Sequence, residues 1–183
     1  MVNMEWLRAM EAWLPELQDL IPPALESVTA GRDDVVAVAL FTDSDARTLQ
    51  PAALSRGRLA ELQAESPDYA VLYAWDPDEW DLLPGQGDRN DLNSVMAKAA
   101  ALAEDVDEAQ WESFLLLAFN WMVEGMKNLA KEGFFDAAYP GANVAFWVTD
   151  TRVHRENLVE WIELLNPPER SAAYVTYLRE HGL

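Results

Sequence analysis

The sequence contains no cysteine and few basic residues. Its 183 residues include 13 Lys and Arg against 32 Asp and Glu, a formal net charge of −19 at pH 7. Without cysteine the chain can form neither a disulfide framework nor a thiol nucleophile. Because nucleic-acid binding needs clustered Lys and Arg to neutralise phosphates, the charge argues against a nucleic-acid partner. It argues equally against an anionic membrane surface.

Long apolar segments are also absent. The first residues have neither the basic region nor the apolar run of a signal peptide. The longest apolar-rich stretch, Phe114 to Val123, is interrupted by Asn120. It is far shorter than the roughly 20 residues needed to span a bilayer. We therefore expect a cytoplasmic protein without a membrane partner.

Known catalytic motifs are missing as well. The sequence has no nucleophile elbow, phosphate-binding loop or dinucleotide-binding loop. Neither His154 nor His181 belongs to a zinc-binding pattern. His154 lies close to Asp150 in sequence and could form an acid–base pair with it, or it could simply cap a helix. The sequence thus predicts no cofactor and favours a protein that is not an enzyme.

What the sequence does contain is ample material for a core. About 50% of the residues are apolar and eight are Trp, so the chain is expected to fold as one domain over residues 1–183. Residues 1–30 form an N-terminal helical segment in this prediction, capped by Asn3. Pro15 and the pair Pro22-Pro23 predict a kink or a break within it.

Hydrophobic periodicity outlines the remaining elements. Three apolar runs predict strands, at Val35 to Phe41, Tyr69 to Trp75 and Asn143 to Thr149. Helices are predicted at Ser55 to Ala64, Asp91 to Ala103, Asp107 to Lys131, Arg155 to Leu165 and from Pro167 to about Glu180. Asp107 and Asn166 are the expected caps of the helices that follow them. This order predicts an α+β fold, with mixed α/β as the alternative: a small sheet of three or more strands, covered by helices, with one long central helix.

Acidic residues follow two of the predicted strands. Asp43 and Asp45 follow the first strand, and Asp150 follows the last. If those strands are parallel, the three carboxylates project at one edge, where they could bind Mg²⁺ or Ca²⁺. Alternatively, each Asp only ends its strand and caps the following turn.

A second candidate site is the segment Trp75-Asp-Pro-Asp-Glu-Trp80 followed by Asp81. Asp76 is expected to cap a short helix, with Pro77 at its first position. The two Trp and the acids between them could frame a contact for a cationic group, with Trp75, Asp78, Glu79, Trp80 and Asp81 as the partner-binding residues. The alternative is that both Trp anchor the turn on the core.

The negative charge is concentrated around this segment. Residues 31–60 hold four acidic and four basic residues, whereas residues 61–92 hold nine acidic residues and one basic residue. An acidic face with embedded aromatic residues is what a binder of a basic protein presents. The alternative is that the acids only keep the protein in solution.

The motifs together resemble a known family. They are the strand ending in Leu40-Phe-Thr-Asp-Ser-Asp45, the pair Pro51-Ala52, the Trp-x-Pro-x-Glu-Trp segment at 75–80, the strand ending in Asp150, and Leu165-Asn-Pro167. This set resembles the bacterial family catalogued as domain of unknown function 4303, over roughly residues 15 to 180. The resemblance implies no established activity. It implies an association with bacterial toxin–immunity neighbourhoods.

These observations lead to one hypothesis and two alternatives. The chain is predicted to be a non-enzymatic acidic binding protein, in particular an immunity-type inhibitor of a basic protein partner. One alternative is a metal-assisted enzyme that uses Asp43, Asp45 and Asp150. The other is a homo-oligomeric module, and the sequence does not define the oligomeric state.

Overall fold

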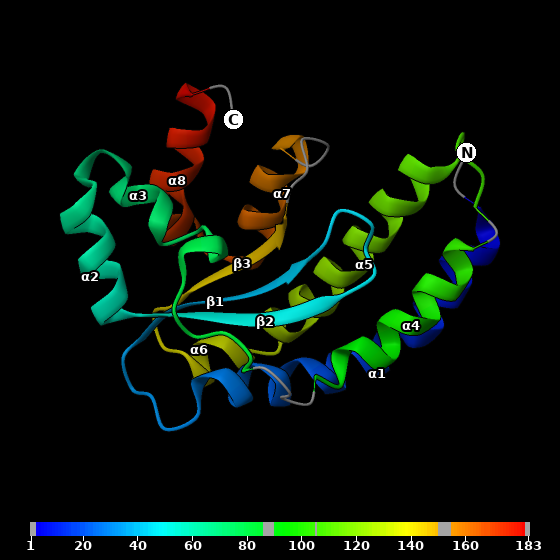
Figure 1. The fold of residues 1–183 in the computed structure, drawn as a ribbon, viewed down its shortest axis with the longest axis horizontal. Helices are drawn as coiled ribbons and strands as arrows, with labels where there is room; N and C mark the ends of the chain where they lie inside the picture. Colours follow the sequence, from blue (N-terminus) through cyan, green and yellow to red (C-terminus); the bar gives the residue numbers. More distant parts are fainter. Residues whose placement is uncertain (1–2, 86–89, 105, 150–154, 182–183) are drawn as a thin grey trace.

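The computed structural model describes residues 3–85, 90–104, 106–149 and 155–181. Over these residues the chain forms a small sheet surrounded by helices (Figure 1). The elements follow one another as α1 (Met4–Thr29), β1 (Val35–Thr42), β2 (Leu49–Ser55), α2 (Arg56–Glu65), η1 (Pro67–Tyr69), α3 (Ala70–Tyr73), η2 (Pro77–Glu79), α4 (Leu92–Ala103), α5 (Trp111–Lys131), α6 (Phe134–Ala138), β3 (Asn143–Val148), α7 (Arg155–Leu165) and α8 (Pro168–Glu180). Within them no helix combines the length and the apolar character needed to cross a membrane.

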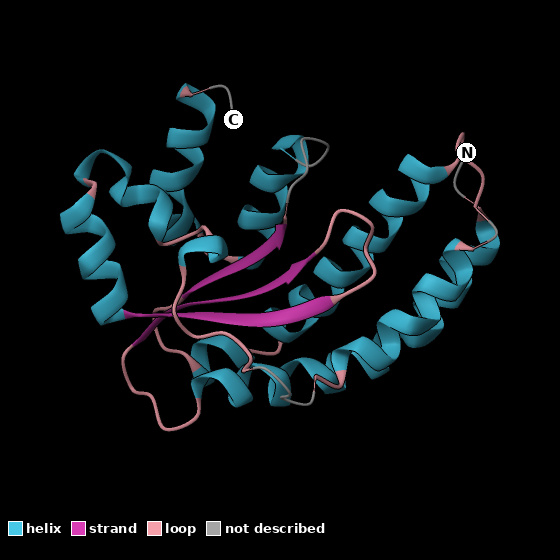
Figure 2. Cartoon of the chain, viewed as in Figure 1, coloured by secondary structure: helices cyan, strands magenta, loops and turns pink. Residues whose placement is uncertain are grey.

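The three strands lie in the order β2-β1-β3 (Figure 2). β1 is antiparallel to β2 and parallel to β3, so the sheet is mixed. The parallel pair aligns Ala37 with Asn143 at one end and Thr42 with Val148 at the other. The predicted α+β class is confirmed, with a small sheet covered by helices.

The two faces of the sheet carry different side chains. One face presents large residues such as Val38, Leu40 and Phe146, which join a core cluster with α1, α4 and α5. The opposite face is built mainly from Ala37, Ala39, Ala52 and Ala145. Because alanine leaves room above the sheet, this second face accepts bulky aromatic side chains from the elements that cover it.

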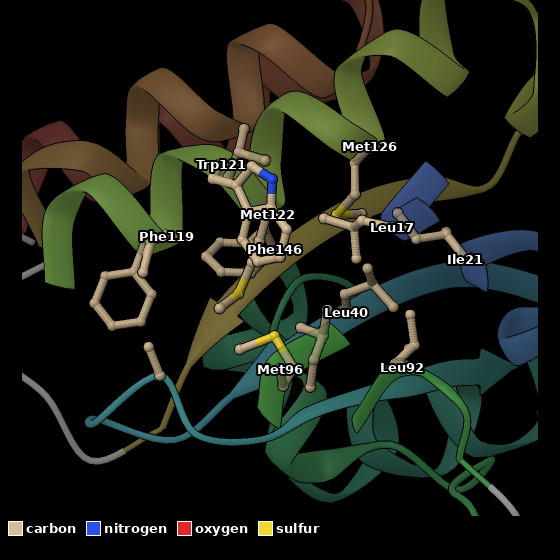
Figure 3. Packing of buried hydrophobic residues seen from close by; sticks show 14 of the residues in the cluster. Leu17, Ile21, Leu40, Leu92, Met96, Phe119, Trp121, Met122, Met126 and Phe146 are labelled. Carbon is tan, nitrogen blue, oxygen red and sulfur yellow. The ribbon is translucent and has the colours of Figure 1, made fainter. Parts of the chain in front are cut away.

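α5 is the central helix that its sequence predicts. Met122 from α5, Met96 from α4 and Leu40 from β1 belong to the same core cluster, and all three are fully buried (Figure 3). α1 packs along α5 at Gly125, where an added Cβ would lie 3.1 Å from Leu17 Cδ2. The glycine therefore sets how closely the two helices approach.

The predicted strand from Tyr69 to Trp75 is wrong. This segment forms the helical turns η1 and α3, which Pro67 begins from the first position of η1. The backbone N–H groups bond locally, Tyr69 N to Ser66 O and Trp75 N to Leu72 O, rather than to a neighbouring strand. The alternating apolar residues that predicted a strand lie instead in helical turns, where Val71 is exposed and Trp75 is buried.

β2 is the strand that the sequence did not predict. Pro51 lies inside it and is aligned with Leu40 of β1. Proline removes a ladder hydrogen bond and is therefore confined to edge strands, which is where β2 lies. An isolated antiparallel bridge between Ala53 and Leu82 covers part of its outer edge.

Prolines do not divide the N-terminal helix. α1 begins after Asn3, whose side chain accepts from Glu5 N as predicted, and continues through Pro15, Pro22 and Pro23. An interior proline costs about 3 kcal/mol. A buried stripe that includes Met10, Leu17, Ile21 and Leu25 offsets this cost by packing along the whole helix.

Two predicted caps have other roles. α5 begins at Trp111 rather than after Asp107, because Asp107 Oδ1 closes the preceding turn by accepting from Gln110 N. Asn166 does not cap α8. It is buried, where its side chain accepts from Val144 N and donates to Val144 O and Ile162 O. It therefore ties the end of α7 to β3.

Two helical glycines give a matched test of the α1–α5 packing. Gly125→Val should destabilise the protein by about 1–3 kcal/mol, because the side chain would overlap Leu17 and Ile21. Gly57→Ala in α2 should be neutral or stabilise by up to about 1 kcal/mol, since its nearest neighbour, Ser55 Oγ, is 3.9 Å from the added Cβ. Urea unfolding of both variants measures the difference; equal effects would contradict the proposed close approach.

Candidate functional site: the tryptophan-flanked turn

The segment between the two tryptophans forms the capped turn that the sequence predicts. Asp76 accepts a hydrogen bond from Asp78 N at 3.1 Å through Oδ1, and Pro77 occupies the first position of η2. Trp80 N closes the turn by donating to Pro77 O at 3.2 Å. The turn therefore holds its acidic residues in a fixed backbone conformation.

Both tryptophans anchor this turn on the alanine face of the sheet. Trp75 and Trp80 are each only 4% exposed. Trp75 stacks on Tyr174 of α8, with ring centroids 5.2 Å apart and planes 3° from parallel. Trp80 donates from Nε1 to Tyr73 O at 2.9 Å. Neither ring offers a broad surface to a partner, so the accessible part of the predicted site is its acidic residues.

All three of these acids are exposed, but Asp81 differs from Asp78 and Glu79 because its carboxylate accepts two hydrogen bonds from Ser55. Asp81 accepts from Ser55 N at 2.9 Å and from Ser55 Oγ at 2.6 Å. Ser55 also caps α2 by accepting from Arg58 N at 3.1 Å. Asp81 therefore connects the turn to the end of β2 and the start of α2.

Asp76 is electrostatically unusual. Burial is the main cause that raises the pKa of its carboxyl to about 6, and the charges of Asp78 and Glu79 add to the rise. The hydrogen bond from Asp78 N opposes the shift but does not cancel it. Close to neutral pH the turn therefore contains a carboxyl group that can gain or lose a proton.

Further exposed acids lie on α2 and η1, and Arg58 links α2 to the turn through Glu61 and Glu79. Glu61, Glu65 and Asp68 of α2 and η1 are exposed, as are Tyr69 and Val71, at 52% and 38%. We call these five residues, together with Asp78 and Glu79, the acidic surface. Arg58 is shared between Glu61 at 3.4 Å and Glu79 at 4.0 Å. Over the residues the structure describes, Glu65, Asp68 and Asp78 form no ion pair.

The carboxylates at the strand ends are arranged differently. β1 and β3 are parallel, and Thr149 N donates to Thr42 O at 2.9 Å, so their ends do lie together. The Asp43 carboxylate, however, is engaged by the turn before β2: it accepts from Asp45 N, Arg47 N, Thr48 N and Thr48 Oγ1. Asp45 is exposed and makes a long ion pair with Arg47 at 3.9 Å.

The metal alternative needs a residue that the structure does not describe. Asp150 and His154 both lie outside the described residues. Within the described part of the chain, no group of three or more His, Asp or Glu side chains could hold a metal ion. His181 stacks on Tyr177 with ring centroids 4.0 Å apart. The alternative with Asp43, Asp45 and Asp150 therefore stays a prediction.

Sequence reasoning missed Tyr174 and Ser55. Tyr174 packs on Trp75 although α8 is far from the turn in sequence, so no local spacing could indicate the pair. Ser55 was expected only to start a helix. Its second role as the partner of Asp81 depends on the chain returning to the edge of β2, which no sequence pattern announces.

A family model described as domain of unknown function (DUF4303) matches residues 23–167. The match contains the sheet, the tryptophan-flanked turn and α5, and stops before α8. No curated protein and no solved structure matches the chain.

The raised pKa of Asp76 predicts a specific dependence of stability on pH. The folded protein binds the Asp76 proton more tightly than the unfolded chain does. The stabilisation that this proton gives the folded state is therefore full below about pH 4 and is lost as the pH rises through about 6. Asp76→Asn keeps the acceptor for Asp78 N and removes the charge. The variant should be more stable than the wild type by about 1–2 kcal/mol at pH 7 and nearly equal to it at pH 4. Urea unfolding at both values measures this.

Asp43 provides the opposite control. Burial raises its pKa, but hydrogen bonds from Thr48 and from the Arg47, Asp45 and Thr48 backbone outweigh burial and lower it. Its stabilisation is therefore present above about pH 4 and lost as the pH falls. Asp43→Asn should destabilise the protein at pH 7, and less so in acid. If Asp76→Asn and Asp43→Asn changed the stability at pH 7 in the same direction, the environments assigned to the two carboxyl groups would be contradicted.

The link between Asp81 and Ser55 gives a second prediction. Asp81→Ala should destabilise the protein by about 1–3 kcal/mol, because the buried Ser55 loses the acceptor for both its N–H and its hydroxyl. Asp78→Ala, on the same turn, should stay within about 0.5 kcal/mol of the wild type. Thermal unfolding of both compares them; an unaffected Asp81→Ala would show that the link is not structural.

Proposed function

The chain belongs to the family of the domain of unknown function 4303, which comes with no assigned reaction, and we propose that it is a non-enzymatic acidic binding protein for a basic protein partner. The partner is held at the acidic surface, in the manner of an immunity-type inhibitor. Asp78 and Glu79 form the centre of the contact.

The observation that carries this proposal is the excess of unpaired acids on an anchored support. Arg58 is the one basic residue that pairs with this surface among the described residues, and it divides its charge between Glu61 and Glu79. Repulsion among the remaining carboxylates costs stability, and a cationic partner would relieve it. Because Trp75 and Trp80 fix η2 on the sheet, the acids are already ordered before a partner arrives.

The exposed apolar residues indicate which cations fit. Tyr69 is 52% exposed and follows the exposed Asp68, so an aromatic ring and a carboxylate are both accessible on η1. An arginine can stack on such a ring while its guanidinium pairs with the carboxylate. Val71 adds apolar contact area at the same surface. A partner with an arginine-containing patch therefore fits better than one with a purely polar lysine-rich tail.

Neutralising the centre of the surface should weaken binding. The tagged protein, mixed with lysate of its source cells at low salt, should capture a basic protein. Calorimetry with that purified partner then gives the affinity. Asp78→Asn with Glu79→Gln should lower the affinity at least about tenfold, and raised salt should lower it further. Asp81 is left unchanged because of its bonds to Ser55.

The control changes the same amount of charge elsewhere. Glu11→Gln with Asp19→Asn alters two exposed acids of α1, outside the acidic surface, and should bind the partner like the wild type. An inhibitor should also block the partner's own activity at a one-to-one ratio. Capture of no basic protein, or equal affinities for both double variants, would overturn the proposal.

A further inference from the structure

An open cleft of about 630 Å³ is lined by none of the residues of the acidic surface. It is formed by the C-terminal end of α1, the loop before β1, the first residue of α2, and α6 with the residues after it. α6 and the end of α1 lie beneath the sheet in Figure 1. This volume is within the range of about 300–1,000 Å³ that is usual for small-molecule sites. The cleft adjoins Val35 at the start of β1, at the opposite end of that strand from Asp43.

Two arginines from separate segments line this cleft. Arg32 donates from Nε and Nη2 to Asp34, at 2.8 and 2.9 Å, which fixes the guanidinium and leaves Nη1 for another acceptor. The guanidinium of Arg56 forms neither a hydrogen bond nor an ion pair within the described residues. Its charge contributes only at longer range to the lowered pKa of Asp34.

Of the basic side chains that the structure describes, Arg8, Arg56 and Lys131 form no ion pair, although the chain has 32 acidic and 13 basic residues. Besides Arg32, six basic residues in the described ranges have a carboxylate within 4.0 Å: Arg47, Arg58, Lys98, Lys127, Arg170 and Arg179. Arg56 is also the first residue of α2, whose first turn contains no acid. A cation is unfavourable there because of the helix dipole. Within the described residues Arg56 therefore contacts no carboxylate, and only the longer-range attraction of Asp34 compensates its charge.

The other residues that line the cleft offer further polar, apolar and charged groups to a ligand. Thr29 Oγ1 donates to Leu25 O, so Tyr139 donates to Thr29 Oγ1 at 3.2 Å and its oxygen can still accept a hydrogen bond. Burial raises the pKa of Tyr139, which keeps the hydroxyl neutral. Phe134 and Pro140 supply apolar surface, and Glu26 and Asp33 add two carboxylates, so an anion is favoured only where it contacts the arginines directly.

From this arrangement we propose that the cleft binds a small organic oxyanion, a molecule with one carboxylate or phosphate group on an apolar ring-sized body. Arg56 and Nη1 of Arg32 hold the oxyanion, since arginine matches carboxylate and phosphate oxygens with paired donors. Phe134 and Pro140 pack against the body. The site uses different residues from the acidic surface and does not depend on a protein partner.

Probe compounds can test each part of this proposal. The full-length protein, labelled with ¹⁵N, is titrated at millimolar concentration with benzoate, phenyl phosphate, inorganic phosphate and neutral benzamide. Saturable shifts are expected at the amides of residues 29–35, 56 and 134–139 with benzoate or phenyl phosphate. Inorganic phosphate lacks the body and benzamide lacks the charge, so both should bind at least about tenfold more weakly. The tighter of the two ring compounds identifies the oxyanion as carboxylate or phosphate.

Substitution of Arg56 separates binding from folding. Arg56→Gln should weaken the better probe at least about tenfold, whereas Arg56→Lys should lose less. Because Arg56 is a cation in the first turn of α2, Arg56→Gln should melt at the same or a higher temperature than the wild type. Arg47→Gln, an exposed arginine next to Asp45, should bind the probe unchanged. The absence of saturable shifts with both ring compounds, or equal affinity for Arg56→Gln and the wild type, would overturn the proposal.

Discussion

Ser55 and its hydrogen bonds to Asp81 connect three parts of the molecule. Ser55 ends β2, caps α2 and binds the carboxylate that follows the tryptophan-flanked turn. Its hydroxyl donates to Asp81 and accepts from Arg58 N, so both hydrogen-bonding functions are used. The next residue is Arg56, which lines the cleft below the sheet. The positions of the acidic surface and of the cleft arginine are thus set by neighbouring residues of one short junction.

The alanine face of the sheet explains why the tryptophans of the turn are buried. Ala37, Ala39, Ala52 and Ala145 leave space that the cluster with Trp75, Trp80 and Tyr174 fills. Burying aromatic rings there contributes several kcal/mol to stability. Of the four residues between the rings, Pro77 is buried and Asp76 is partly buried, whereas Asp78 and Glu79 are exposed. The same anchoring that stabilises the fold therefore orients Asp78 and Glu79 toward solvent.

Local signals predicted much of the fold, whereas contacts between distant segments could not be predicted. The stripe of α5, the apolar runs of β1 and β3 and the Asp76–Pro77 cap each depend on neighbours within a few residues. β2 contains Pro51, which reads as a strand breaker unless the strand is known to lie at an edge. At the candidate site, the sequence left two interpretations open: acidic residues that bind a cationic partner, or tryptophans that anchor the turn on the core. The stack on Tyr174 shows that Trp75 anchors the turn, whereas the binding role of the acids stays a prediction.

The acidity of the turn also affects its own protonation. Asp78 and Glu79 add to the raised pKa of Asp76, although burial is the larger cause. A cationic partner that pairs with Asp78 and Glu79 would remove their share of the rise and so favour the ionised form of Asp76. Closer burial by the same partner would act in the opposite direction. Asp76 also accepts the capping hydrogen bond from Asp78 N. Protonation of Asp76, capping of η2 and contact of a partner with Asp78 would therefore all involve the same turn. Binding of such a partner at the acidic surface would therefore be linked to proton uptake or release near pH 6, and the sign of this linkage would report whether charge pairing or burial dominates.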